Sequence, residues 1–433
     1  MEQKLTYSEK GLWRNRSYVA LMGAQLVSNL GDWLYLLALL TMIGLKWNAT
    51  PWEITITMLS ILFPMLIGGP IAGMLADRVE RKKLMIISDV ARFAIVIGLI
   101  FVTALWQVYL ILIIKGVFDV LFSPAKNGKL KEIVPSEQME KAVSYSSIIE
   151  QGSKIIGPAI GGMLTAAFGV SICFMIDAAT FLVSACILLA VPGKKILSTV
   201  KASSVQIEEK TNVEKTGFWS ELAAGMKLIV SIPLIAYGTL TLGMALLVLQ
   251  IADSQTVVLF REIPGMSEDI FGWCITLSGV GTLASVGIIQ LLRSWSPLTK
   301  MGVGGALLGT VFALAGYASA HLPANGWVFI IIMMLFFLAG LGAGMTFVPF
   351  NVMLQQKTPE AMIGRVFGTV TSITSAASVL GPVFGGTLVT AFGPAPAFII
   401  SGGLMAVIGL LLLVFRPMIM KRDYRGTEGI TVG

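Results

Sequence analysis

The chain has 433 residues, of which 55% are hydrophobic and 13% are charged. Because soluble domains carry about 25% charged residues, this composition excludes a water-soluble fold and indicates that lipid surrounds most of the surface. Three cysteines form no paired framework and no CxxC, and a single histidine excludes a His-based metal cluster. We therefore expect no disulfide, no metal and no other cofactor.

Apolar runs of about 20 residues predict membrane-spanning helices. The first six runs are Tyr18–Leu45, Ile54–Ala76, Leu84–Leu105, Tyr109–Phe122, Ala142–Phe168 and Val170–Val191. The other six are Leu234–Phe260, Ile270–Leu292, Met301–Ala320, Trp327–Leu354, Val366–Phe392 and Pro396–Phe415. The first run is too long for a signal-peptide core, so we expect it to be retained as a helix.

A polar stretch rich in Lys and Glu separates the two sets of runs. It predicts an N-terminal bundle over residues 1–191, a cytoplasmic linker over 192–217 and a C-terminal bundle over 218–433. The segment Phe218–Ser231 reads equally well as a short amphipathic surface helix and as the start of the seventh span.

Basic residues are distributed unevenly between the two sides of the membrane. Of 31 Lys and Arg residues, 26 fall on the side that holds both termini, among them Lys126 and Lys129 in the predicted loop after the fourth span, and only 2 fall opposite. The positive-inside rule then places both termini of a multi-pass cell-membrane protein in the cytoplasm. The net charge of +7 follows from this topology, so nucleic-acid binding is not needed to explain it.

An internal repeat organises the chain. The segment Gly157–Gly169 matches Gly381–Gly393 without a gap, at an offset of 224 residues. Spans four to six and ten to twelve are therefore copies, and we predict an all-α integral membrane fold of twelve helices in two pseudo-symmetric six-helix bundles. Several transporters use this architecture, with the substrate site where the halves meet.

The segment after the second span resembles the cytoplasmic loop signature of the major facilitator superfamily, a glycine followed by Asp-Arg and a basic pair. The matching positions are Gly73, Asp77, Arg78, Arg81 and Lys82. The resemblance implies that Gly73 allows two helices to approach closely and that Asp77 is a charge partner that latches the inward-closed state. Glu80 stands where the family usually has Gly, which leaves the turn geometry open. The alternative is an ordinary positive-inside loop.

The fifth span resembles a signature found chiefly in exporters of the same superfamily. Its residues are Gly152, Gly157, Pro158, Gly161 and Gly162. A proline removes one helix hydrogen bond, and glycines leave a groove for a neighbouring helix, so simple packing is the alternative reading. The segments Gln25–Trp33, Asp89–Arg92 and Pro124–Pro135 extend the resemblance over the full length. They are most similar to the branch with macrolide-efflux and siderophore-export proteins.

Ionisable residues inside spans are costly and are functional candidates for that reason. Asp32 and Asp253 take corresponding places when Ser28–Asp32 is aligned with Leu249–Asp253. We hypothesise that both face a central cavity and that at least one accepts a proton, the alternative being a hydrogen-bonded structural carboxylate. Asp177 lies near the outer end of the sixth span, where we expect it to be hydrated.

Two charged pairs share a helix face, because their members are four residues apart. They are Lys115 with Asp119 and Glu150 with Lys154. Structural neutralisation, including exchange of partners between the two helices, is the simpler reading. A charge relay or ligand contact is the functional one. In the superfamily a basic residue near the position of Lys115 is implicated in proton coupling, and the resemblance implies that role here.

The predicted function is therefore secondary-active export of an amphipathic or hydrophobic small molecule by alternating access, with proton antiport and with the protein acting as a monomer. A lipid or lysolipid flippase and a dedicated siderophore or metabolite exporter remain alternatives. The sequence holds no P-loop, nucleophile elbow or HExxH motif, so neither an ATP-driven pump nor an enzyme is expected. A receptor would need an added signalling domain, which neither the termini nor the linker has the length to supply.

Overall fold

The computed structural model describes residues 12–135, 138–193, 233–266, 268–321, 326–357 and 363–430. These residues are almost entirely helical and contain no strand. The long helices are α2 (Arg16–Thr41), α3 (Pro51–Arg78), α4 (Arg81–Leu99), α5 (Leu105–Ile133), α6 (Met139–Phe168), α7 (Val170–Leu189), α9 (Pro233–Arg261), α10 (Glu268–Leu291), α11 (Pro297–His321), α12 (Gly326–Lys357), α13 (Ile363–Phe392) and α14 (Pro394–Ile430). Short turns η1 (Leu12–Arg14) and η2 (Met42–Lys46) flank α2. The predicted linker, from residue 194 on, and Phe218–Ser231 lie outside the described residues.

Ten of these helices are long and apolar enough to cross a membrane, which confirms an all-α integral membrane fold. The two that do not meet this description are α4 and α6. Both are long enough, but α4 begins with three basic residues and contains Asp89 and Arg92, while α6 carries Glu150 and Lys154. Charge lowers the hydropathy of these two helices, although charged residues also occur inside α2, α5, α7 and α9.

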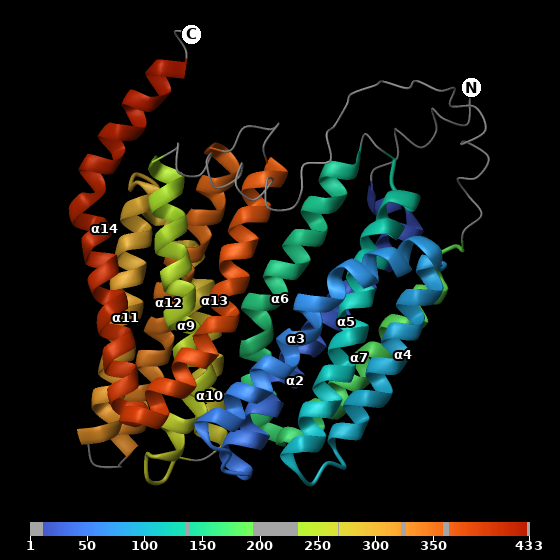
Figure 1. Ribbon diagram of the computed structural model, residues 1–433, viewed down its shortest axis with the longest axis horizontal. Coiled ribbons are helices and arrows are strands. Elements are labelled where there is room, and N and C mark those ends of the chain that lie inside the picture. Colours follow the sequence, from blue (N-terminus) through green and yellow to red (C-terminus); the bar gives the residue numbers. More distant parts are fainter. Residues whose placement is uncertain are drawn as a thin grey trace. The chain divides into compact units, whose positions relative to one another are not determined.

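The chain divides into two compact units, each described here by itself. Unit 1 comprises residues 1–43 and 56–210, and unit 2 comprises residues 44–55 and 211–433. In unit 1, α2 packs against α6 and α7, and α4 packs against α5 and α7. In unit 2, α11 packs against α12 and α14, α10 against α12, and α9 against α13. The helices of unit 2 lie side by side with their axes close to one direction (Figure 1).

The sequence repeat is also a structural repeat. Helices α6 and α13 both have 30 residues, and both their first and last residues are 224 positions apart. Each helix ends before a glycine with positive φ, 79° at Gly169 and 84° at Gly393. Glycine adopts this backbone conformation without a Cβ clash and so allows the helix to end sharply before the next begins.

The repeated glycines make equivalent helix contacts in the two units. A Cβ on Gly157 would lie 2.5 Å from the Cβ of Trp33 on α2, and a Cβ on Gly381 would clash with that of Gln250 on α9. Small residues at these positions allow the helices to approach closely. Helix α6 therefore packs on α2 as α13 packs on α9.

These contacts correct the alignment of the two intramembrane aspartates. Trp33 and Gln250 occupy equivalent places, which sets an offset of 217 residues between α2 and α9. By that offset Asp253 corresponds to Leu36, four residues beyond Asp32. Because four residues make about one helical turn, the two aspartates lie on similar helix faces but one turn apart.

The fourth span is longer than its apolar run. The predicted span ends at Phe122, with Lys126 and Lys129 in a loop, but α5 continues through Pro124 to Ile133. Both lysines are buried inside the helix, at 9% and 2% exposure. The prediction was wrong because hydropathy falls where the charges begin, whereas the helical backbone continues through those charges.

Candidate functional site

Six of the charged side chains on the helices of unit 1 lie together. We call them the charge cluster: Asp32 on α2, Asp89 and Arg92 on α4, Lys115 and Asp119 on α5, and Asp177 on α7. Five of them are joined by ion pairs, and Asp177 is buried nearby. The sequence singles out three members as coupling candidates, and the structure brings those three together.

Lys115 links α2 to α5. Its Nζ donates to Oδ1 of Asp32 at 2.9 Å and to Oδ2 of Asp119 at 3.0 Å. The ammonium also lies 4.7 Å from the ring centre of Tyr35 and 5.5 Å from that of Phe181. With a side chain only 5% exposed, Lys115 depends on these carboxylates and aromatic faces in place of water.

Arg92 forms the second centre of the cluster. It donates to Asp89 on its own helix and to Oδ1 of Asp119 at 3.3 Å. Its guanidinium stacks 4.6 Å from the ring centre of Phe122 and 4.5 Å from that of Phe181. Asp119 therefore accepts from both cations and connects α4 to α5. The sequence places Arg92 inside a span and we assigned it no role, although a charged pair three residues apart inside an apolar run is a signal for such a site.

Asp89 and Asp177 are the fully buried carboxyls, each at 0% exposure. Asp89 accepts from Ser184 Oγ at 2.6 Å in addition to Arg92. Asp177 receives only a 3.4 Å contact from the hydroxyl of Thr180, and its Oδ2 has no hydrogen-bond partner in the described part of the chain. The expected hydration of Asp177 is wrong, because α7 packs this carboxyl against Gly31 of α2.

The cluster contains more acids than bases. Four carboxyls face two cations, and of the carboxyls only Asp32, with a side chain 35% exposed, and Asp119, at 22%, are open to solvent. Unbalanced charge inside a membrane protein is costly. The cluster is neutral only when two of its carboxyls hold protons, so this arrangement can store and release protons.

The remaining coupling candidates lie apart from the cluster. Glu150 and Lys154 pair with one another on α6 at 3.0 Å, with side chains about half exposed, 50% and 47%. The structure thus contains both predicted same-face pairs but no exchange of partners between them. Asp253 on α9 has an exposed side chain and no hydrogen-bond or ion-pair partner among the described residues of unit 2.

The basic residues after α3 fasten the end of unit 1. Arg81 donates to the backbone oxygen of Gly128 at 3.0 Å and to Glu132 at 2.8 Å, and Lys82 donates to the backbone oxygen of Leu189 at 2.8 Å. These bonds tie the start of α4 to α5 and α7. Glu80 has φ −60° and ψ 115°, an extended conformation that any residue adopts, so the turn does not require glycine.

The other signature positions lie at the end of α3 and along α6. Arg78 is exposed at the end of α3, whereas Gly73 and Asp77 lie within α3 with side-chain positions outside the described set. On α6, Gly161 and Gly162 are buried, and a Cβ on Gly161 would meet Leu37 of α2 at 2.8 Å. Of the other signature positions on α6, Gly152 has open space around it and Gly157 packs on α2. The helix continues through Pro158.

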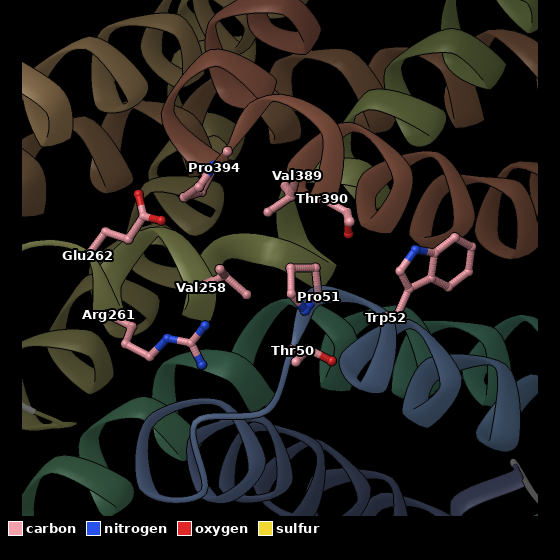
Figure 2. Close-up of a pocket in the computed structure, with 10 residues that line it drawn as sticks. Thr50, Pro51, Trp52, Val258, Arg261, Glu262, Val389, Thr390 and Pro394 are labelled. Carbon is pink, nitrogen blue, oxygen red and sulfur yellow. The ribbon is translucent and has the colours of Figure 1, made fainter.

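A surface pocket of about 360 Å³ lies in unit 2, lined by residues of the 44–55 segment, α9, α13 and α14. Figure 2 shows Thr50 and Pro51 beside Val258 and Arg261, with Trp52 pointing away. Arg261 donates to the backbone oxygen of Ala49 at 2.8 Å. Its hydrogen bond therefore holds the 44–55 segment against the end of α9.

Two helical units related by a repeat, with titratable groups inside their spans, define a membrane transporter of the inverted- or parallel-repeat class. The chain belongs to the Major Facilitator Superfamily, whose family model matches residues 21–374 and 255–429. Membership also makes it a transport protein and not an enzyme.

Proteins similar to this chain include named exporters. The chain is 38% identical to the uncharacterized MFS-type transporter YfiS of Bacillus subtilis (strain 168), over 97% of this chain and 98% of that protein. It is 25% identical to the enterobactin exporter EntS of Shigella flexneri, covering 87% and 85%. It is 24% identical to macrolide efflux protein A of Streptococcus pyogenes, covering 82% and 86%. The crystal structure of the nucleoside transporter NupG shares the fold, with a TM-score of 0.66 at 14% identity, covering 92% and 98%.

Proposed function

We propose that this protein is a secondary-active exporter that couples inward movement of protons to outward movement of an amphipathic or hydrophobic small molecule. The observation that carries the proposal is the excess of carboxyls over cations in the charge cluster. The exporter names of two relatives support efflux. Both termini face the cytoplasm in this proposal, as the basic loops indicate, and the transporter acts as a monomer.

Asp32 is the proton acceptor in this proposal, because it is the most exposed carboxyl of the charge cluster. When Asp32 takes up a proton, it loses its charge and its attraction for Lys115. Lys115 then keeps Asp119 as its only ionised partner, which weakens the link between α2 and α5. Because Asp32 and Lys115 belong to different helices, proton uptake changes how strongly these helices are held together.

Asp253 provides a second proton acceptor in unit 2, with no cation to neutralise it in the described part of that unit. Glu150 and Lys154 have the weaker claim to coupling, since each is neutralised by the other in half-exposed positions. The signature after α3 acts as a cytoplasmic gate, and the glycines and proline of α6 allow that helix to move against α2.

Asp32→Asn is expected to reduce pH-gradient-driven transport to the level of empty vesicles while the variant still binds substrate. The amide keeps the size of the side chain but cannot exchange a proton. Substrates are first identified in cells in which the gene is deleted or overexpressed. These cells are screened for changed sensitivity to toxic compounds and for changed release of secreted metabolites. The variant is then reconstituted in proteoliposomes, and substrate movement is followed with the gradient imposed and collapsed.

Asp269→Asn is the matched control, because Asp269 is an exposed aspartate at the start of α10. It should transport at the wild-type rate. Full gradient-dependent transport by Asp32→Asn would show that Asp32 is not the proton acceptor. Drug hypersensitivity of the deletion strain without metabolite retention would identify a multidrug exporter. Metabolite retention without drug hypersensitivity would identify a dedicated metabolite exporter. Movement of labelled lysolipid would identify a flippase.

A further inference from the structure

One buried cation of unit 1 has no carboxylate within hydrogen-bond distance among the described residues. Unit 1 has four basic side chains with 9% exposure or less in its described residues: Arg92, Lys115, Lys126 and Lys129. Three of them bind carboxylates, Lys129 through Glu132 at 2.8 Å and the other two within the charge cluster. Lys126 donates only to a neutral hydroxyl, that of Ser146.

The neighbours of Lys126 already use their own hydrogen-bonding capacity. Ser146 Oγ accepts from Lys126 Nζ at 3.2 Å and donates to Gln25 Oε1 at 2.8 Å. Gln25 Nε2 donates to the backbone oxygen of Ser146 at 3.1 Å. An ammonium has three donors, so two N–H groups of Lys126 remain without an acceptor among the described residues. Gln25, Lys126 and Ser146 come from α2, α5 and α6 and form what we call the Lys126 site.

A buried ammonium without an anion is costly, and removing it would normally stabilise the protein. The nearest acid along α6 is Glu150, one turn beyond Ser146, and Lys154 already binds it at 3.0 Å. Glu150 acts on Lys126 only through space, without a hydrogen bond between them. The Lys126 site therefore has a cation, a hydroxyl and an amide in place, and it lacks an anion in direct contact with the ammonium among the described residues.

The position of the site suits a ligand with an apolar body. Lys126 is seven residues from the end of α5 and Ser146 seven residues from the start of α6, so both are about 10 Å inside that end of unit 1 at 1.5 Å per residue. The residue just before each of the three, Ala24, Ala125 and Tyr145, packs in or against one apolar cluster. An inorganic anion would make no use of this apolar surrounding.

We propose that the Lys126 site binds the acid group of an amphipathic organic anion, which is the substrate that the transporter carries. This inference rests on the proposed export function and adds the substrate class to it. The same chemistry, an oxyanion on an apolar body, occurs in a soluble organic acid and in an anionic lysolipid. The experiment separates these two sources.

The test measures equilibrium binding to the purified full chain in phosphatidylcholine nanodiscs, with no pH gradient. The first probe pair is 1-naphthaleneacetate and its neutral amide. The second pair is lysophosphatidylglycerol and lysophosphatidylcholine. The wild type is expected to bind the anionic member of at least one pair about tenfold more tightly or better, the scale of one charged hydrogen bond. Preference within the first pair indicates a soluble acid, and preference within the second a lipid.

Lys126→Gln should bind both members of each pair alike, and Lys126→Arg should retain the preference for the anion. Lys131→Gln is the matched control, since Lys131 is an exposed lysine on the same helix, and it should behave as the wild type. Thermal unfolding without ligand verifies folding: Lys126→Gln should unfold at the same temperature or higher, because it removes an unpaired buried charge.

The site is refuted if the wild type prefers neither anion, or if folded Lys126→Gln keeps the preference. These outcomes are separate from those for the export function. Loss of anion preference in Lys126→Gln supports the site even when Asp32→Asn leaves transport unchanged. Retained preference in Lys126→Gln refutes the site even when Asp32→Asn abolishes coupling.

Discussion

Lys115→Met is expected to lower the stability of unit 1 by about 3–5 kcal/mol, the usual cost of removing one partner from a buried ion pair, and to abolish transport. The methionine fills a similar volume, so the loss is electrostatic. Asp32 and Asp119 would lose the ammonium that lies 2.9 Å and 3.0 Å away. Asp119 would keep Arg92 at 3.3 Å, whereas Asp32 forms no other ion pair among the described residues of unit 1.

The measurement is the midpoint of thermal unfolding in detergent, together with transport in proteoliposomes. Lys154→Met is the stability control, because its ion pair with Glu150 is about half exposed and such pairs contribute about 0–1 kcal/mol. Lys115→Arg should keep most of the stability, since it preserves the charge. Equal thermal shifts for Lys115→Met and Lys154→Met would show that the charge cluster does not stabilise unit 1.

Spacing within one helix predicts contacts well, as Lys115–Asp119 and Glu150–Lys154 illustrate. Both pairs are four residues apart, and both ion pairs are present at 3.0 Å. The bond between Lys115 and Asp32 joins residues 83 positions apart. It depends on how α2 and α5 pack, which no local pattern encodes. The sequence could identify each of these residues as a candidate, but it could not predict that they form an ion pair with one another.

Burial was harder to predict than helix position. The sixth span was expected at Val170–Val191 and α7 runs over Val170–Leu189, yet Asp177 within it is fully buried and was expected to be hydrated. Helix α2 buries the carboxyl of Asp177, because Gly31 on that helix has no side chain and leaves room for it. Lys126 was missed for a related reason, because a lysine after an apolar run reads as a loop residue until its tertiary neighbours are known.

Gly402→Ala is expected to destabilise unit 2 by about 1–3 kcal/mol or more, the range for overpacking a close helix contact. The new methyl carbon would lie 2.5 Å from both the backbone nitrogen of Ala313 and the backbone oxygen of Gly309 on α11. These are backbone atoms of a packed helix and cannot rotate away as a side chain can. Helices α11 and α14 must therefore separate, and the contact that glycine permits at this crossing is lost.

Gly403→Ala is the matched control on the next residue of α14, because a Cβ on Gly403 has nothing within 4 Å. Alanine favours a helix over glycine by about 1 kcal/mol, so this variant should unfold at the wild-type temperature or above it. Thermal unfolding and the yield of monodisperse protein are measured for both variants. A Gly402→Ala midpoint equal to that of Gly403→Ala would mean that α11 and α14 do not pack as closely as the structure shows, because identical chemistry at neighbouring positions leaves only the helix contact to differ.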